Sequence, residues 1–264
     1  MKKHRIDVLM VARGLAESRN RAQRLIMAGE VRVAGEMIHK PSTQVSEDVQ
    51  IEVKVRPKYV SRGGKKLEAA IDAFSIPVSG KVCADVGAST GGFTDCLLQN
   101  GATKVYAIDV GYGVLHWKMR QDPRVVVMER VNARYLDSLP EPMDLVTIDA
   151  SFISLNLILP AVIHWFNGSS GQVVALVKPQ FEAGRKAAAV HAGVIKDHAV
   201  HKQVLTDTLS GSLALGLRAV GLIPSPIKGP KGNVEFLVNL VLGDNKMEGD
   251  LDEMVQQALT QIPQ

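Results

Sequence analysis

The sequence predicts an α/β protein in which a small N-terminal α+β module precedes a larger domain built on a mostly parallel sheet of seven strands. From residue 67 onward, short apolar runs alternate with helical stretches, as in doubly wound sheets. The 264 residues suffice for two domains of unequal size. Residues 1–66 hold 15 Lys and Arg against 7 Asp and Glu, whereas the remainder holds 16 against 20. We place the boundary so that the domains are 1–58 and 59–264.

The N-terminal module begins with two short helices. The first, in "RIDVLMVAR", ends at Gly14, and the second starts at the N-cap residue Ser18 and ends at Gly29. A hairpin follows in "EVRVAGEMI", turning at Ala34 and Gly35, and "VQIEVKV" alternates like a further strand. Two helices and a small sheet therefore form one compact module.

The second helix carries Arg21 and Arg24 roughly opposite its apolar arc. The order of helix, glycine and short strand in "ESRNRAQRLIMAGEVRVAG" resembles the αL-type RNA-binding module named after a ribosomal small-subunit protein, S-four. Together with the positive charge, the resemblance implies an RNA partner. The alternative is a solvated basic surface without a partner. The side chains expected to contact RNA are Arg5, Arg19, Arg21, Arg24, Lys40 and Arg62.

The larger domain follows a polar linker, "KVRPKYVSRGG" at 54–64. Its buried strands are predicted in "KVCADVG", "KVYAIDVG", "RVVVME", "MDLVTIDA" and "QVVALVKP". Helices are expected after Gly92, around 113–120, across 153–165 and at about 197–214. Two last strands, "LRAVGLIPSPI" and "VEFLVNLVL", form an antiparallel pair. Such an ending is typical of S-adenosylmethionine (SAM)-dependent methyltransferases, so we predict a Rossmann-like fold of that class.

A glycine-rich turn, "ADVGASTGGFTD" at 84–95, ends the first strand of this domain. Gly87, Ser89 and Gly91 spell G-x-S-x-G, the turn that presents the nucleophilic serine of many hydrolases. The same residues suit a cofactor loop, because glycines let the backbone approach a ligand at the carboxyl ends of the strands. Asp109 ends the next strand, where an acidic residue would bind a ribose diol.

The cofactor interpretation is stronger than the alternatives. Ser89, Asp149 and His191 or His198 supply the chain order of a hydrolase triad, but no HGGG-like oxyanion segment is present. A P-loop is excluded because no Gly-Lys-Ser/Thr follows the turn, and the spacing is not that of a dinucleotide site. The residues expected to bind SAM are Asp85, Gly87, Ser89, Gly91, Gly92, Asp109 and Asn132.

Charged residues gather at the strand ends that face this loop. Asp149 ends the fourth strand, Lys178 ends the fifth, and Glu235 starts the last. Lys65 and Lys66 lie where a helix enters the domain, in "SRGGKKLEAA". Charged residues often end strands and helices, but two lysines and two carboxylates on one rim of the sheet favour a site.

Five motifs in order resemble the TlyA family, also called hemolysin A-like, over nearly the whole chain: "SRGGKKL", "DVGASTGGFTD", "VTIDASFISL", "VKPQFEAGR" and "KGNVEFL". Its members join an S-four-type module to a methyltransferase domain similar to that of FtsJ. The resemblance implies methylation of cytidine 2′-hydroxyls in ribosomal RNA by a tetrad that corresponds to Lys66, Asp149, Lys178 and Glu235. The motif spacing selects Lys66, and the adjacent Lys65 is the alternative.

The reaction needs the attacking oxygen aligned with the sulfonium methyl group and one proton removed. We assign Lys178 as the base or as the group that orients the oxygen, with Asp149 holding it. Lys66 and Glu235 would complete the network and position the nucleotide. No metal is required for this chemistry, and no ligand cluster suggests one.

Two features of the expected site stay open. A flipped target base is expected, and Phe152 and Phe181 are both candidates for its stacking partner. Loop 182–195 is either a lid over the site or a connection.

Composition limits the remaining functions. No apolar run approaches the ~18 residues that span a bilayer, and the start of the chain leaves no room for a signal-peptide core. Cys83 and Cys96 match no zinc spacing and suit a reducing compartment. We expect a cytoplasmic protein that acts on ribosomal RNA or ribosomal subunits, without a membrane partner and with its oligomeric state open. The competing functions are a non-catalytic ribosome assembly factor and a membrane-damaging hemolysin.

Overall fold

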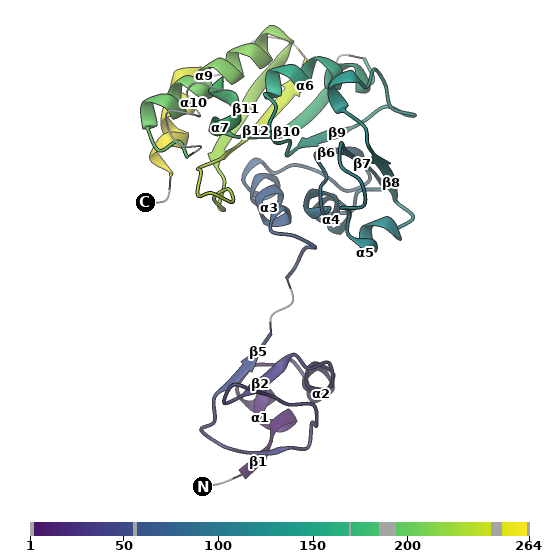
Figure 1. Ribbon diagram of the computed structural model, residues 1–264, viewed down its shortest axis with the longest axis vertical. Coiled ribbons are helices and arrows are strands. Elements are labelled where there is room, and N and C mark those ends of the chain that lie inside the picture. Colours follow the sequence, from purple (N-terminus) through teal and green to yellow (C-terminus); the bar gives the residue numbers. More distant parts are fainter. Residues whose placement is uncertain (1–2, 55–56, 169, 185–193, 244–249, 263–264) are drawn as a thin grey trace. The chain divides into compact units, whose positions relative to one another are not determined.

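A computed structural model describes residues 3–54, 57–168, 170–184, 194–243 and 250–262 (Figure 1). The chain divides into two compact units, Met1–Pro57 and Lys58–Gln264. Each unit has its own hydrophobic core, and we describe each by itself.

The first unit packs two helices against short strands. The helices are α1 (Ile6–Ala12) and α2 (Arg19–Met27), and the sheet has the order β3-β2-β5, with β2 (Val31–Val33), β3 (Glu36–Met37) and β5 (Ile51–Val53). The predicted hairpin turn holds Ala34 and Gly35 at φ values of 48° and 84°. The sequence did not indicate the antiparallel pair of β1 (Lys3–Arg5) and β4 (Gln44–Ser46), because these strands are too short to alternate visibly.

The predicted amphipathic face of α2 is present. Ala22, Leu25 and Ile26 are buried in the core of the first unit, and Arg21 and Arg24 are exposed. Burial of this apolar arc holds α2 against α1 in the core of the first unit, because apolar surface removed from water supplies most of the stabilisation of so short a helix.

In the described residues of the second unit, seven strands form one sheet of order β11-β12-β10-β9-β6-β7-β8. The strands are β6 (Val82–Val86), β7 (Lys104–Asp109), β8 (Val125–Glu129), β9 (Leu145–Ile148), β10 (Gly171–Val177), β11 (Leu217–Pro224) and β12 (Phe236–Leu242). Strand β12 is antiparallel to both neighbours, and the other strands run in one direction. The predicted mostly parallel sheet of seven strands is confirmed. Its strand order reverses at β6, between β7 and β9.

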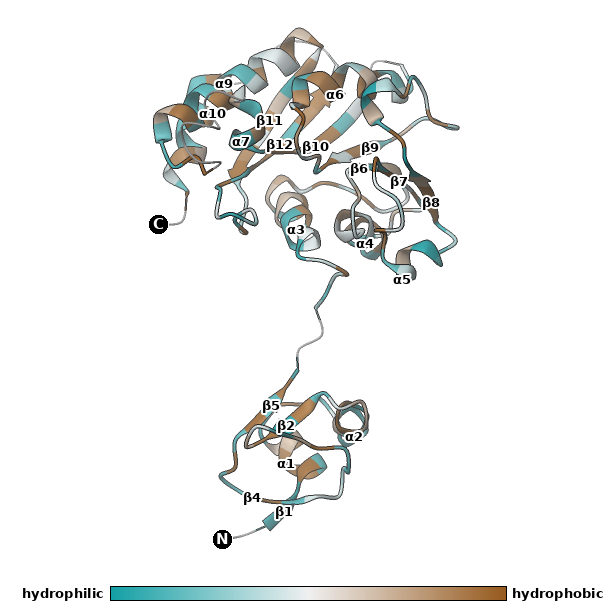
Figure 2. Cartoon of the chain, in the orientation of Figure 1, coloured by the Kyte–Doolittle hydropathy of each residue, from teal (hydrophilic) through white to brown (hydrophobic). Residues whose placement is uncertain are grey.

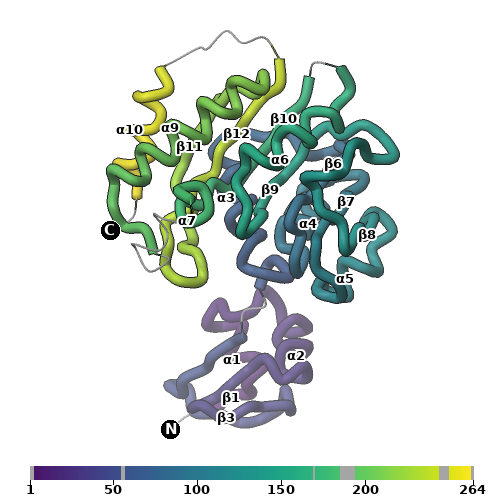
Figure 3. The backbone as a smooth tube through the Cα atoms, turned by 45° about the horizontal axis from the view of Figure 1, so that its top comes forward, coloured from purple at the N-terminus to yellow at the C-terminus, as the bar shows by residue number. Residues whose placement is uncertain are grey.

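Helices cover both faces of this sheet (Figures 1 and 3). One face carries α6 (Leu155–Val162), α9 (His198–Ala214) and α10 (Leu251–Thr260), and the other carries α3 (Gly63–Phe74) and α4 (Gly92–Gln99). The hydrophobic strands between them separate two core layers (Figure 2). This burial on both faces explains why the central strands read as continuous apolar runs.

Several predicted boundaries need correction. The linker is shorter than 54–64, because Tyr59 is buried against Gly64 and α3 already begins at Gly63. The helix expected around 113–120 is the single turn α5 (Trp117–Arg120). The short α7 (Pro179–Glu182) and the terminal α10 were not predicted. No helix among the described residues is long and apolar enough to cross a membrane.

Candidate active site

A cavity of about 640 Å³ opens at the carboxyl ends of β6, β9 and β10. Its walls come from the start of α3, the loop after β6, the segment after β9, α7 and the loop between β11 and β12. The reversal of strand order at β6 is where sheets of this type bind their ligands, and the volume is that of a small-molecule site.

The loop between β6 and α4 forms one wall of the cavity. Gly87 and Gly91 have φ values of 81° and 91°, and Ser89 is left-handed at 49°. A Cβ atom at Gly87 would lie 2.8 Å from the carbonyl oxygen of Asp149. Only glycine therefore allows this loop to touch the segment after β9. The Ser89 amide donates a 2.8 Å hydrogen bond to Oδ2 of Asp109, which fixes the loop on the end of β7.

The predicted cofactor residues occupy different positions relative to the cavity. Gly87, Ser89 and Gly92 line it. Asp109 lies behind the loop, where it also accepts a hydrogen bond from the Gly111 amide. Gly91 has no place in the lining, and its αL conformation starts α4.

Asp85 and Asn132 lie outside the cavity lining. Asp85 is fully buried and accepts hydrogen bonds from the Thr94 amide and hydroxyl at 2.8 and 2.6 Å, so it supports the loop from below. Its predicted direct contact with a cofactor is therefore revised. Burial raises the pKa of Asp85 to about 7. Asn132 is exposed and caps the turn Ala133–Tyr135 through the Arg134 amide.

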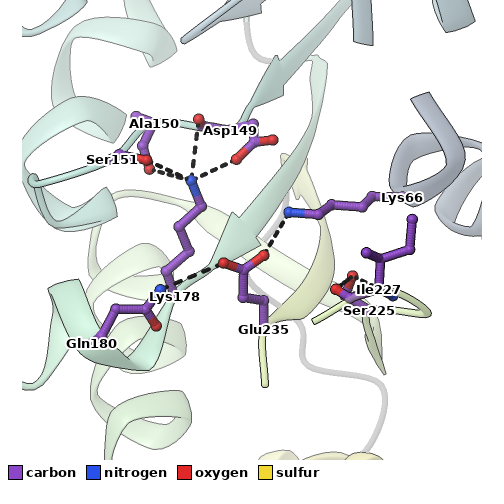
Figure 4. A network of polar contacts seen from close by, with 9 residues as sticks. All are labelled: Lys66, Asp149, Ala150, Ser151, Lys178, Gln180, Ser225, Ile227 and Glu235. Carbon is purple, nitrogen blue, oxygen red and sulfur yellow. Dashed lines mark hydrogen bonds and ion pairs between the residues drawn. The ribbon is translucent and has the colours of Figure 1, made fainter. Parts of the chain in front are cut away.

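Two lysine–carboxylate pairs face the cavity (Figure 4). Nζ of Lys66 lies 2.6 Å from Oε2 of Glu235, and Nζ of Lys178 lies 2.6 Å from Oδ1 of Asp149. The four residues come from α3, the end of β10, the segment after β9 and the residue before β12. The four residues therefore lie on one rim of the sheet, as the sequence predicts.

Lys178 has further oxygen partners. Its Nζ donates to the carbonyl oxygens of Asp149 and Ala150 at 3.3 and 3.0 Å and to the Ser151 hydroxyl at 3.0 Å. The residue is only 6% exposed, so this amino group is held tightly between the cavity and four oxygen atoms. An amino group in such a setting acts as a hydrogen-bond donor.

The geometry distinguishes Lys66 from Lys65. Helix α3 buries Gly64, Lys66 and Leu67, whereas Lys65 is exposed. Gly64 has no side chain because a Cβ atom there would lie 2.2 Å from the Tyr59 ring. The helix therefore approaches Tyr59 closely, and Lys66 is the lysine that reaches Glu235.

Sequence reasoning missed two polar residues in the site. Ser151 accepts from Lys178, and Nε2 of Gln180 donates a long 3.5 Å hydrogen bond to Oε1 of Glu235. Gln180 thus contacts one carboxylate oxygen of Glu235, and Lys66 contacts the other (Figure 4). Both are adjacent to predicted residues in "DASF" and "VKPQ", and Pro179 at the start of α7 turns Gln180 toward the cavity. The sequence therefore indicated Ser151 and Gln180 only by their position next to residues that were predicted to lie in the site.

Aromatic side chains border the same cavity. Phe152 is 89% exposed and has a φ of 65°, a strained conformation for an aromatic residue. Its ring centroid lies 4.9 Å from that of Phe181, and Phe181 lies 5.9 Å from Nζ of Lys178. Strain held at a cavity points to function. Most of loop 182–195, the candidate lid, lies outside the described residues.

The comparisons with known proteins agree with this geometry. Residues 59–241 match the family described as FtsJ-like methyltransferase, and residues 4–51 match the S4 domain. The chain is 43% identical to the 16S/23S rRNA (cytidine-2′-O)-methyltransferase TlyA of Mycobacterium tuberculosis over 98% of both proteins. The chain belongs to the TlyA family of FtsJ-like methyltransferases. The predicted SAM-dependent methyltransferase fold is confirmed.

Two further relatives support membership of the TlyA family. The chain is 50% identical to a candidate rRNA methyltransferase, YqxC of Bacillus subtilis, over 94% of this chain and 89% of the relative. A solved structure described as a candidate hemolysin of Streptococcus thermophilus has a TM-score of 0.72 and 44% identity, and the match covers 99% of this chain and 97% of that one.

The hydrolase interpretation of the glycine turn is wrong for this TlyA-family chain. Asp149 is paired with Lys178, and no histidine is among the described residues that line the cavity. His198 starts α9, while His191 lies outside the described residues. Among the described residues that line the cavity, Ser89 therefore has no histidine to act as its base.

The predicted RNA-binding residues fall into two groups. Arg21, Arg24, Lys40 and Arg62 are exposed. Arg5 and Arg19 are half-buried or exposed, and both form ion pairs with Asp7. Arg62 lines the cavity together with Lys228 and Lys231 from the loop between β11 and β12, and all three are exposed, so the mouth of the cavity carries positive charge.

Proposed function

We propose that this protein transfers the methyl group of SAM to the 2′-hydroxyl of a cytidine in ribosomal RNA. The observation that carries the proposal is the pair of lysine–carboxylate contacts, Lys66–Glu235 and Lys178–Asp149, facing one cavity beside a glycine loop. The names of the two rRNA-methylating relatives supply the substrate class.

SAM occupies the part of the cavity next to the loop after β6. Gly87, Ser89 and Gly92 hold its amino-acid end, where small residues and backbone amides can contact a carboxylate. Asp109 binds the ribose diol with the acceptor capacity that its two backbone contacts leave free. Asn132 is assigned to the adenine. Asp85 keeps the loop in place from beneath.

The target ribose enters from the side of Lys178. Transfer forms a bond between the 2′-oxygen and the methyl carbon, breaks the carbon–sulfur bond and releases the hydroxyl proton. The enzyme contributes mainly alignment. We assign orientation of the attacking oxygen to Lys178, which is supported by the four oxygens that already engage its Nζ. Asp149, whose other carboxylate oxygen has no such contact with Lys178, receives the proton.

The remaining cavity residues position the nucleotide. Lys66 and Glu235 hold each other rigidly, and Gln180 extends that contact toward Lys178. Phe152 is the stacking partner that we assign to the flipped base, because it is far more exposed than Phe181. The cations Arg62, Lys228 and Lys231 at the mouth suit the RNA backbone.

The N-terminal unit supplies affinity for RNA. Arg21, Arg24 and Lys40 are exposed on it, and cationic surfaces of this kind bind phosphates without reading sequence. We propose ribosomal RNA or a ribosomal subunit as the partner, in the cytoplasm and without a bound metal.

The test is incubation of the protein with radiolabelled SAM and stripped ribosomal subunits. Label in ribosomal RNA supports the proposal. RNA binding without label would support an assembly factor instead, and leakage of liposomes without either would support a lysin.

A further inference from the structure

Asp7 in the first unit has an unusual set of partners. It lies in the first turn of α1 and is fully buried. Its Oδ1 accepts from Nε of Arg5 at 3.0 Å, and its Oδ2 accepts from Nη2 of Arg5 at 3.0 Å, from Nε of Arg19 at 2.9 Å and from Nε2 of Gln23 at 2.9 Å. One buried carboxylate therefore holds two arginines from different elements.

The two arginines keep unused donors. Arg19 uses only Nε, so both of its terminal nitrogens are free of Asp7, and Arg5 keeps Nη1. The side chain of Arg19 is 54% exposed, and that of Arg5 is 38% exposed. Both guanidinium groups contact the same carboxylate oxygen, so Asp7 holds these two partly exposed side chains near one another at the surface of the unit. A phosphodiester presents two anionic oxygens that fit such a pair of forks.

A purely structural role does not account for this arrangement. Burying a carboxylate is costly, and one bidentate arginine with Gln23 would already satisfy it. The second arginine, Arg19, adds a charge on a side chain that is 54% exposed. Hydrogen bonds from Arg5 first, and also from Gln23 and Arg19, hold the pKa of Asp7 well below its ordinary value, so burial does not neutralise this carboxylate.

We propose that Asp7 is a positioning residue that holds Arg5 and Arg19 as a preformed phosphate-binding pair for the RNA backbone. The inference rests on the proposed function, because it takes RNA as the ligand. It adds a residue that never touches the RNA and whose charge opposes RNA binding.

Because the charge of Asp7 opposes RNA binding, the two explanations predict opposite changes in RNA affinity when Asp7 is replaced. Replacing Asp7 by Asn removes one negative charge, so the net charge of the unit becomes more positive by one. If charge alone governed affinity, RNA binding would become tighter. If positioning governs it, binding weakens, since an Asn amide would point a donor at a guanidinium and release the arginines. Ordering two free arginines on binding predicts about tenfold weaker affinity.

The experiment uses the full chain and a ribosomal RNA fragment, with the dissociation constant measured at several salt concentrations. Asp7→Asn is compared with Glu52→Gln, which removes one exposed negative charge from β5 of the same unit. The Glu52 variant is expected to bind as tightly as the wild type or slightly more tightly. Equal or tighter binding by Asp7→Asn would overturn the inference.

Two further variants separate positioning from loss of fold. Gln23→Met removes a partner of Asp7 and leaves both arginine contacts, so it reports the effect of a weakened core contact and is expected to retain RNA affinity. In an Arg5→Ala, Arg19→Ala background, Asp7→Asn is expected to change affinity no further. A further loss there, or an equal loss in Gln23→Met, would show a structural role.

Failure of the inference differs from failure of the proposed function. If RNA is not the ligand, the wild type itself neither binds nor methylates the fragment. If only the inference fails, the wild type does both and Asp7→Asn resembles it.

Discussion

Nζ of Lys178 lies 2.6 Å from Oδ1 of Asp149, and it donates in addition to two carbonyl oxygens and the Ser151 hydroxyl. The amino group that faces the candidate active-site cavity is thus held by oxygen atoms. These contacts favour the role that we propose for Lys178, orientation of the attacking oxygen, over the role of base.

Arginine in place of Lys178 is the sharpest test of that role. An arginine donates hydrogen bonds but does not give up its charge, so it can orient the attacking oxygen and cannot accept its proton. We expect Lys178→Arg to retain a few per cent of kcat, and Lys178→Ala to lose about 10³-fold. Both are expected to bind SAM like the wild type in calorimetry. If the arginine variant is as inactive as the alanine variant, Lys178 is the base.

For the buried pair of Lys66 and Glu235, we expect that stability can be restored by a second substitution while activity cannot. Glu235→Gln leaves Lys66 buried without its anionic partner, which is expected to lower the free energy of unfolding by about 3 kcal/mol. Replacing both, as Lys66→Met with Glu235→Leu, is expected to restore most of that stability without restoring methylation. Urea unfolding and methyl transfer are measured on the same preparations. A double variant that regains activity would contradict the positioning role.

Ser89 is expected to matter little for turnover. Ser89 lines the cavity next to the assigned amino-acid end of SAM, so Ser89→Ala is expected to weaken SAM binding by about threefold to tenfold with kcat nearly unchanged. A nucleophilic serine would lose all activity. Titration of SAM by intrinsic fluorescence, together with kcat at saturating SAM, distinguishes the two.

Asp85 predicts a pH dependence of stability. Burial raises its pKa from 3.8 to about 7, so the folded protein binds this proton more tightly than the unfolded chain. The stabilisation from the neutral acid is complete below about pH 4 and is lost as the pH rises to about 7. The stability of Asp85→Asn relative to the wild type is therefore expected to increase between pH 4.5 and pH 8 in urea unfolding. A constant difference across that range would contradict the raised pKa.

The cations at the cavity mouth predict a salt effect on catalysis. Lys228→Ala with Lys231→Ala is expected to raise the KM for RNA and to reduce the salt slope of log KM by about 1 to 2, since each phosphate contact releases counterions. The control is Lys202→Ala on α9, away from the cavity. An unchanged slope would remove these lysines from the RNA path.

The sequence predicted the sheet and most of the rim. The described central strands of the second unit were found because burial on both faces makes them apolar, and the edge strands β8 and β11 were found although they are only partly buried. The paired terminal strands indicated a methyltransferase sheet. The four charged residues of the rim, Lys66, Asp149, Lys178 and Glu235, were predicted from their positions at the ends of strands and of a helix and from the motifs that resemble the TlyA family.

The remaining features depend on contacts that no local pattern encodes. The burial of Tyr59 under Gly64, which shortens the linker, is a packing contact. Asp85 reads as a cofactor ligand in sequence but lies beneath the loop. Gln180 carries no motif of its own, and the partners of Asp7 come from three separate points in the sequence.

The most direct test of the account is to map the modified nucleotide. Ribosomal RNA treated with the wild type and SAM is digested to nucleosides and analysed by mass spectrometry, with Asp149→Ala as the inactive control. We expect 2′-O-methylcytidine in the wild-type sample and none in the control. A methyl group on a base, or no methylation of RNA by the folded wild type, would contradict the proposed function.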